Sequence, residues 1–309
     1  MVDLETFLTA LFVLVDDFCK THPLPTHPGP KWKLSPSEAI TLLLFAQWAR
    51  FRSERDFYRF ASDRLRPLFP NLPSRPQLNR QWRALFPQVC AVLVALADLL
   101  TGLDDLYQVL DLAPVVTRDA KRRGSGWLAG QADIGKSTRL GWYEGLKAIL
   151  AATPSGVLTG FGLAPASTKE QPFAESFFAL RAFPHPACPS VGRAHRGRYY
   201  VMDNGFEGEE NRKHWAEQYG IWAIYPPKRN ARTPWPKALR RWLAHLRQII
   251  ETVVDKLWNA FRLDRERPHT LMGLFTRLAA KMALHNFCIW LNRQLERPAL
   301  AFADLLGWA

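Results

Sequence analysis

The pattern of apolar and polar residues divides the chain into a helical first part and a second part in which strands alternate with helices. In the first part, apolar residues recur at helical spacing from Leu4 to Val15. Ser35, Ser53 and Ser74 each stand where an N-cap serine would begin a further helix. An apolar stretch over 89–103 predicts one more helix. We therefore predict an all-helical domain over residues 1–104.

The second part begins with the short apolar run 107–111, which predicts a buried strand that ends at Asp111. Further strands are predicted over 145–151, 156–163, 199–203 and 221–225. Helices are predicted over 169–183, 207–219, 238–261 and 271–295. Such alternation is typical of an α/β domain with a mixed sheet covered by helices. We place this domain at 105–297 and a C-terminal tail at 298–309.

The charge of the chain narrows the range of partners. It has 41 Lys and Arg against 28 Asp and Glu, which gives a formal net charge of +13 and favours a polyanionic partner, either nucleic acid or an anionic membrane surface. The apolar N-terminus carries acids and no basic leading segment, so we predict neither a signal peptide nor a membrane span. The four cysteines are scattered, which favours a reducing cytoplasm.

Three acids occupy positions that suit joint chemistry. Asp111 and Asp203 each end a predicted strand, and Glu251 lies within the long helix predicted over 238–261. If the two strands are neighbours and the helix crosses beside them, the three carboxylates converge. Mg²⁺ prefers hard oxygen ligands, and two such ions suit an in-line displacement at phosphorus. A helix cap or a surface salt bridge is the alternative for each acid taken alone.

The order of three short motifs resembles bacterial insertion-sequence transposases of the DDE type. The segment 247–292 resembles the C-terminal segment of that family, in which an Arg stands four residues before the catalytic Glu, as Arg247 stands before Glu251. The stretch Asp203-Asn204-Gly205-Phe206 is similar to the signature around the second acid of the family. The stretch from Leu110 to Val115 is similar to the strand that carries the first acid. The resemblance extends over nearly the whole chain from Ser35 onward.

This resemblance implies a ribonuclease H-like catalytic domain in which Asp111, Asp203 and Glu251 are the metal ligands. It also implies that Arg247 contacts DNA phosphate. The predicted cofactor is a pair of Mg²⁺ ions, with Mn²⁺ able to substitute. The strand order read from the residues alone agrees with this fold.

The chain departs from the family pattern at two positions. Many relatives have Tyr three residues before the Arg and Lys seven residues after the Glu, whereas this chain has Ala244 and Trp258. Lys256 is near the second position but out of register, which favours a solvated surface role for it. Asp255 lies one helical turn after Glu251 and is the nearest alternative to it.

Three basic stretches are predicted to bind DNA. The helix that follows Ser74 has a polar face suited to base edges and phosphates, and with the preceding helix it could form a helix-turn-helix. Two basic loops would hold the phosphate backbone near the acids. The predicted DNA-binding residues, together with Arg247, are Arg75, Gln77, Asn79, Arg80, Arg83, Lys121, Arg122, Arg123, Lys228, Arg229 and Arg232.

Two other motifs do not fit the sites that they suggest. Residues 130–137 match the P-loop pattern GxxxxGK[ST], but neither a strand before them nor a helix after them is predicted, so no nucleotide cofactor is expected. His185, Cys188, His195 and His214 are loosely grouped, and their spacing matches no usual zinc site.

Taken together, the sequence predicts a transposase of an insertion sequence. It would cleave phosphodiester bonds at the element ends and join the 3′-hydroxyls to target DNA. The expected partner is double-stranded DNA, both terminal repeats and target, bound by a homodimer in the cytoplasm at the nucleoid. The alternatives are a metal-dependent nuclease that does not join strands and a domesticated DNA-binding protein.

Overall fold

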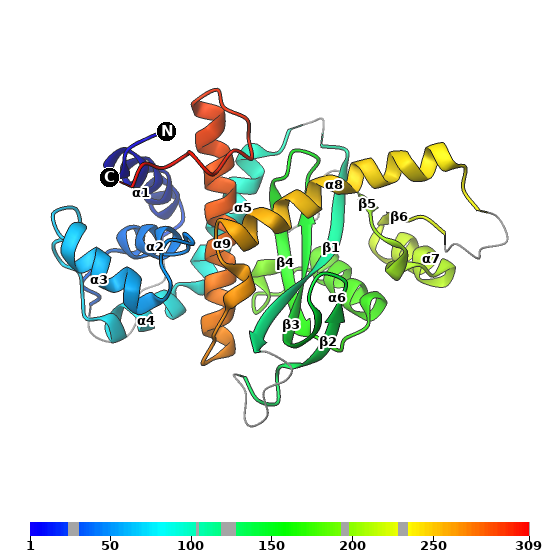
Figure 1. The fold of residues 1–309 in the computed structure, drawn as a ribbon, viewed down its shortest axis with the longest axis horizontal. Helices are drawn as coiled ribbons and strands as arrows, with labels where there is room; N and C mark the ends of the chain where they lie inside the picture. The colour runs from blue at the N-terminus through cyan, green and yellow to red at the C-terminus, as the bar shows by residue number, and fades with distance from the viewer. Residues whose placement is uncertain (24–30, 103–104, 119–127, 193–197, 228–233, 309) are drawn as a thin grey trace.

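A bundle of helices and a twisted sheet lie side by side, with one long helix between them. The computed structural model describes residues 1–23, 31–102, 105–118, 128–192, 198–227 and 234–308. Figure 1 shows the N-terminal helices at one end, the sheet toward the other, and α9 (Leu271–Gln294) between the two.

The described residues of the first part form five helices. They are α1 (Leu4–Thr21), α2 (Pro36–Phe45), α3 (Glu54–Arg64), α4 (Arg75–Ala84) and α5 (Phe86–Leu100). Of these, α2, α3 and α4 begin directly after the predicted N-cap serines. The Ser35 hydroxyl accepts the backbone N–H of Glu38 at 3.1 Å, and the Ser53 hydroxyl accepts that of Asp56 at 3.1 Å. Within the described residues, no single helix is long and apolar enough to span a membrane, and α4 with α5, bent by 60°, meets that test only as a pair.

The sheet has six strands and a mixed topology. They are β1 (Tyr107–Arg118), β2 (Asp133–Ser137), β3 (Gly141–Ala152), β4 (Leu158–Pro165), β5 (Tyr199–Val201) and β6 (Trp222–Ile224). β3 pairs antiparallel with β1, β2 and β4, whereas β5 pairs parallel with β1 and β6. This α/β arrangement, preceded by helices, confirms the predicted ribonuclease H-like fold.

One strand was not predicted. The residues that match the P-loop pattern form a turn and β2, which pairs with the first half of β3 from Asp133 opposite Gly145 to Ser137 opposite Gly141. A turn, not a helix, follows Ser137, so the helix N-terminus that would hold a phosphate is missing at this point. Residues 130–137 therefore lack the helix that follows the lysine in a P-loop.

Helices cover both faces of the sheet. On one face, α6 (Glu170–Ala182) and α7 (Glu209–Tyr219) pack against Leu110, Tyr200 and Met202. On the other face, α5, α9 and α8 (Lys237–Asn259) pack against Val109 and Val201. Successive residues of β1 and β5 therefore belong to different clusters, because side chains alternate across a strand.

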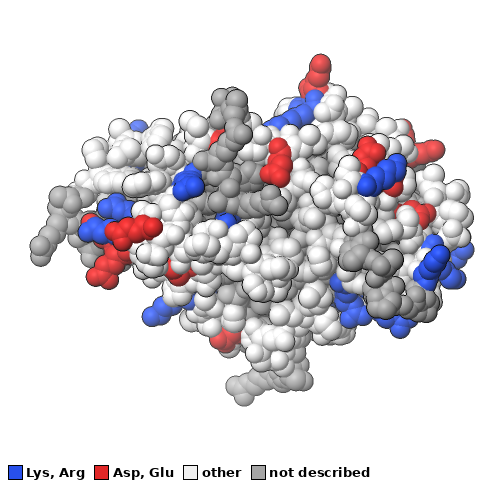
Figure 2. All heavy atoms as spheres, turned by 180° about the vertical axis from the view of Figure 1, so that it is seen from behind, with Lys and Arg blue, Asp and Glu red and all other residues white. Residues whose placement is uncertain are grey.

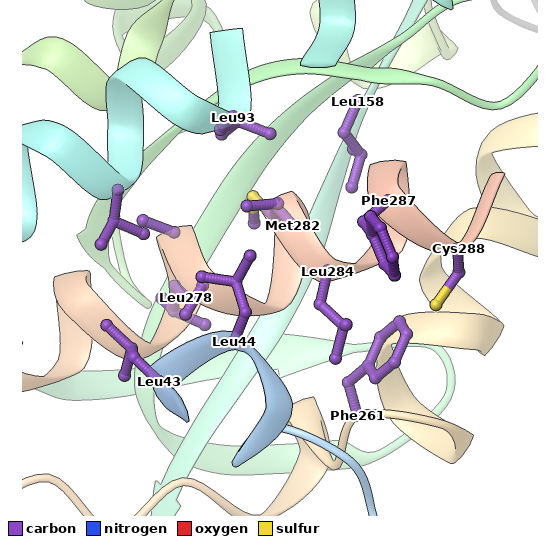
Figure 3. Close-up of a cluster of buried hydrophobic side chains, with 14 of the residues drawn as sticks. Leu43, Leu44, Leu93, Leu158, Phe261, Leu278, Met282, Leu284, Phe287 and Cys288 are labelled. Carbon is purple, nitrogen blue, oxygen red and sulfur yellow. The ribbon is translucent and has the colours of Figure 1, made fainter. Parts of the chain in front are cut away.

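The core is centred on α9. Its residues from Leu274 to Asn292 are almost all buried, as expected for a helix that is apolar on every side. Figure 3 shows side chains of α9, among them Leu278, Met282 and Phe287, close to residues of α2, α5 and β4. The C-terminal segment joins the same cluster through Phe302, Leu305 and Leu306. One hydrophobic cluster thus links the N-terminal helices, the sheet and the C-terminus, and the division at residues 104 and 297 stays a prediction.

The side chain of Asn286 on α9 hydrogen-bonds to the backbone of β4. The fully buried amide of Asn286 accepts the backbone N–H of Leu158 at 2.9 Å and donates to its carbonyl oxygen at 2.8 Å. These are the two hydrogen bonds that a neighbouring strand would otherwise make.

We expect Asn286→Leu to lower the free energy of unfolding by about 3 kcal/mol, because it leaves both backbone groups of Leu158 buried without partners. Urea denaturation measures this loss. The matched control is Asn259→Leu on the exposed surface of α8, which should change stability by less than about 1 kcal/mol. Equal losses in the two variants would contradict the account of the α9–β4 contact.

Candidate active site

The pairing of β1 with β5 places Asp111 and Asp203 side by side. Tyr107 to Val109 pair in parallel with Tyr199 to Val201, and each Asp lies two residues beyond the last pair. Both aspartates therefore share the side of the sheet on which Val109 and Val201 face α8.

The prediction that Asp111 ends its strand is wrong. β1 continues to Arg118, because β3 pairs with it along its length and Asp111 lies opposite Leu150. What ends just before Asp111 is the pairing with β5. The carboxylate therefore lies where the sheet opens between two strands, with one neighbour strand still holding its backbone.

A tight turn orients Asp203. Its Oδ1 accepts the backbone N–H of Gly205 at 2.7 Å, at the start of the short helix η2 (Asn204–Phe206). Phe206 is buried in the cluster beneath α6, which anchors the turn. A Cβ on Gly205 would lie 1.6 Å from Glu170 Oε2, so no larger residue fits there without a shift. The Gly and Phe of the Asn-Gly-Phe sequence are therefore explained by this turn: Gly205 fits beside Glu170, and Phe206 anchors the turn in the core.

Helix α8 contributes Arg247 and Glu251. Arg247 Nη2 lies 3.3 Å from Asp111 Oδ2 and 4.0 Å from Asp203 Oδ2, so one guanidinium faces both carboxylates. Glu251 is one turn further along α8 and is exposed. Asp255, the alternative to Glu251, is engaged elsewhere: it lies 3.6 Å from Arg139 Nη2 and accepts a hydrogen bond from Asn259 at 2.8 Å.

Several acids lie close together in the site, and this is reflected in the pKa values of Asp111 and Glu170. Burial raises the pKa of Asp111 to about 6; Arg247 opposes this shift, and the charges of Asp203 and Glu251 add to it. Burial likewise raises the pKa of Glu170, with smaller contributions from Asp203 and Asp111, while Lys147 lowers it. Glu170 therefore lies close to Asp111 and Asp203. It is a fourth acid near the site, in addition to these two and Glu251.

The donor set suits a hard divalent cation. Asp111 and Asp203 offer carboxylate oxygens that converge on one positive group, Arg247, and charge repulsion among the acids would be relieved by further positive charge. Among the residues that the structure describes, no three His, Cys, Asp or Glu side chains are close enough to form a metal site. Of the three predicted metal ligands, Glu251 is the one whose side chain is exposed to solvent. The group on α8 that faces the two aspartates is Arg247.

The structure places the predicted DNA-reading residues of α4 in different environments. Arg75, Gln77 and Arg80 are exposed, and Arg83 is half-buried. Gln77 Oε1 accepts hydrogen bonds from the Ser74 hydroxyl and backbone N–H, which fixes the start of α4. Asn79 donates to Glu54 on α3 at 2.6 Å. Arg75 and Arg80 are therefore the arginines of this set whose side chains remain exposed.

Several predicted residues cannot be placed. Lys121, Arg122, Arg123, Lys228, Arg229 and Arg232 lie outside the described residues, as does His195. Figure 2, the view from behind, shows Lys and Arg gathered mainly at the end formed by the N-terminal helices, with a largely uncharged middle. His214 pairs with Glu175 at 3.0 Å, which is consistent with a structural role.

Two groups of functional candidates were not found from the sequence. Glu170 reads as an ordinary acid in the first turn of a helix, and only the fold brings it to Gly205. The first half of α8 carries exposed Lys237, Arg240, Arg241 and Trp242, with no acid before Glu251. An acid-free basic run in an amphipathic helix was a visible signal that could have identified this second group.

The pKa of Asp111 predicts how stability depends on pH. Because this pKa is about 6 in the folded protein and 3.8 ordinarily, the contribution of the protonated carboxyl is fully present below pH 3.8 and is lost as the pH rises through 6. Asp111→Asn cannot ionise, so its stability relative to wild type should be about 2.5 kcal/mol greater at about pH 8 than at about pH 4. Urea denaturation with a chelator present measures the difference, and an unchanged difference at the two pH values would contradict it.

Comparison with known proteins identifies the family. A family model described as the transposase DDE domain matches residues 110–287. Among solved structures, the chain is similar to the Mos1 transposase in a paired-end complex with the left transposon end, at 11% identity and a TM-score of 0.24, with 80% of this chain and 83% of that chain covered. No curated protein matches. Because the matching family model spans more than half of the 309 residues, the chain belongs to the transposase DDE domain family.

Proposed function

We propose that this protein is the transposase of an insertion sequence, which cleaves phosphodiester bonds at the element ends and joins the freed 3′-hydroxyls to target DNA. The observation that carries the proposal is the convergence of Asp111 and Asp203 on Arg247, from the helix that also bears Glu251. Family membership supports it.

In this proposal, Asp111, Asp203 and Glu251 hold two Mg²⁺ ions, with Mn²⁺ able to substitute. When bound, such a pair activates a water or hydroxyl and stabilises the leaving oxygen of an in-line displacement. The turn at Gly205 holds the Asp203 carboxylate in a fixed orientation, and β3 holds the backbone of Asp111. Arg247 would leave the aspartates and bind a DNA phosphate, which would attach the scissile strand to α8 one turn before Glu251.

The DNA would reach the site along α8. In 237–250 this helix has four Lys and Arg and no acid, and its first half is exposed. Basic side chains at a helix N-terminus are disfavoured by the helix dipole, so phosphate groups beside them would stabilise this end. The basic stretches Lys121 to Arg123 and Lys228 to Arg232 belong to the same proposal, since they flank β1 and α8 in sequence.

The remaining parts of the proposal follow from two-ended recombination. Two element ends must be joined, so we propose a homodimer on DNA that acts at the nucleoid in the cytoplasm and needs no nucleotide cofactor. The helices of residues 1–104 would bind the terminal repeats, and 105–297 would be the catalytic domain.

The direct test is incubation of the protein with Mg²⁺ and DNA that carries the native element ends. We expect strand-transfer products, reduced at least about 100-fold by Asp203→Asn. Asp255→Asn, on the same helix as Glu251 but paired with Arg139, is the matched control and should retain activity. Cleavage without joining would indicate a nuclease, and end-specific binding without turnover would indicate a domesticated DNA-binding protein.

A second test concerns α4. Replacing the exposed Arg75 and Arg80 with Ala should remove most discrimination between terminal-repeat and random duplex, because their side chains are free to reach base edges. Competition binding in a chelator measures the ratio of the two affinities. Replacing exposed Arg59 and Arg64 of α3 removes the same charge from the neighbouring helix and should leave the ratio unchanged. Persistent discrimination in the α4 variant would refute this role.

A further inference from the structure

An open cleft lies between the β2–β3 hairpin and the beginning of α6. Its volume is about 530 Å³, and the residues that characterise its lining are Lys136, Trp142, Lys147, Lys169, Glu170 and Gly205. None of these residues was singled out from the sequence as a binding residue.

The cleft adjoins the candidate active site. Gly205 lies in the turn whose backbone N–H donates to Asp203, and Glu170 lies against that turn. The charge of Asp203 is also close enough to Glu170 to raise its pKa, second to the effect of burial. A chain molecule seated in the cleft would therefore pass directly beside the carboxylates.

The lining carries more positive than negative charge. Three lysines line the cleft against one acid, Glu170. Lys136 and Lys169 are exposed, and neither has an ion pair with another residue in the described ranges. Lys147 is half-buried and donates to the carbonyl oxygen of Thr168 at 2.8 Å, which leaves its charge at the wall of the cleft. Such a lining attracts an anionic ligand.

An aromatic ring stands at the same cleft. Trp142 is 65% exposed, and it is the cross-strand partner of Lys136, whose ammonium lies 5.7 Å from the centre of the indole ring. A large apolar ring in water is unfavourable, and the 65% exposure of Trp142 leaves ring surface available to a planar partner. Lysines along a groove beside an exposed aromatic ring are the combination by which proteins bind single-stranded nucleic acid.

We propose that this cleft binds a single-stranded segment of DNA, with backbone phosphates on Lys136 and Lys169 and one base stacked on Trp142. The inference rests on the proposed function, because it takes DNA as the ligand, and it deepens that function by assigning the path of a strand beside the carboxylates. The ligand is recognised by charge and by the flat face of a base, so little sequence preference is expected.

The test is the binding of a fluorescein-labelled oligothymidylate of roughly ten nucleotides, followed by fluorescence anisotropy in a chelator. Trp142→Ala should weaken binding about tenfold, whereas Trp142→Phe, which keeps an aromatic face, should retain most of the affinity. Trp222→Ala removes a comparably exposed indole from β6 and should have no effect. Equal binding by Trp142→Ala and wild type, or an equal loss in Trp222→Ala, would overturn the proposal.

The lysines are tested by salt dependence. Replacing Lys136 and Lys169 with Ala should reduce the slope of log affinity against log salt by about 1.4, since each phosphate contact to a single strand contributes about 0.7. The charge-matched control replaces Lys20 on α1 and Lys213 on α7, and its slope should equal that of wild type. An unchanged slope in the Lys136 and Lys169 variant would contradict the assignment of phosphates to these side chains.

The binding assay separates this proposal from the proposed function. It is carried out in a chelator, so it needs neither metal nor turnover. If the wild-type protein shows cleft-dependent binding but gives no strand transfer with Mg²⁺ and the native element ends, the cleft is supported and the transposase is refuted. Strand transfer by a protein whose single-strand binding does not depend on Trp142 would support the transposase and refute the cleft.

Discussion

The parallel pairing of β1 with β5 is the constraint on which the site depends. Three residue pairs set the register, and each strand then delivers an aspartate two residues later on the same side of the sheet. A shift of one residue in either strand would turn one carboxylate to the opposite face, among the side chains that pack under α6 and α7. The two acids can meet Arg247 only in the register that is observed.

That register is held by packing on both sides. Leu110, Tyr200 and Met202 belong to the cluster beneath α6 and α7, whereas Val109 and Val201 belong to the larger cluster that α9 organises. Helix α8 packs into the larger cluster through Ile250 and Val253. The part of α8 that carries Arg247 and Glu251 is therefore fixed relative to the strands. The polar site thus lies where two apolar clusters end.

Much of this arrangement could be predicted from the sequence because its signals are local. The N-cap serines, the apolar α9, and the spacing of Arg247 and Glu251 within one helix all depend on residues a few positions apart. The course of β1 beyond Asp111 could not be predicted in this way, since it depends on pairing with β3 roughly thirty residues further on. Strand β2 and the approach of Glu170 to Gly205 were missed for the same reason.

A crystal soaked in Mn²⁺ tests most directly whether Asp111, Asp203 and Glu251 form one metal site, as proposed. We expect anomalous scattering from Mn²⁺ bound by carboxylate oxygens of Asp111 and Asp203, with Glu251 drawn inward and Arg247 displaced from the aspartates. Anomalous density elsewhere in the molecule, or none, with Arg247 still beside both aspartates at saturating Mn²⁺, would contradict it.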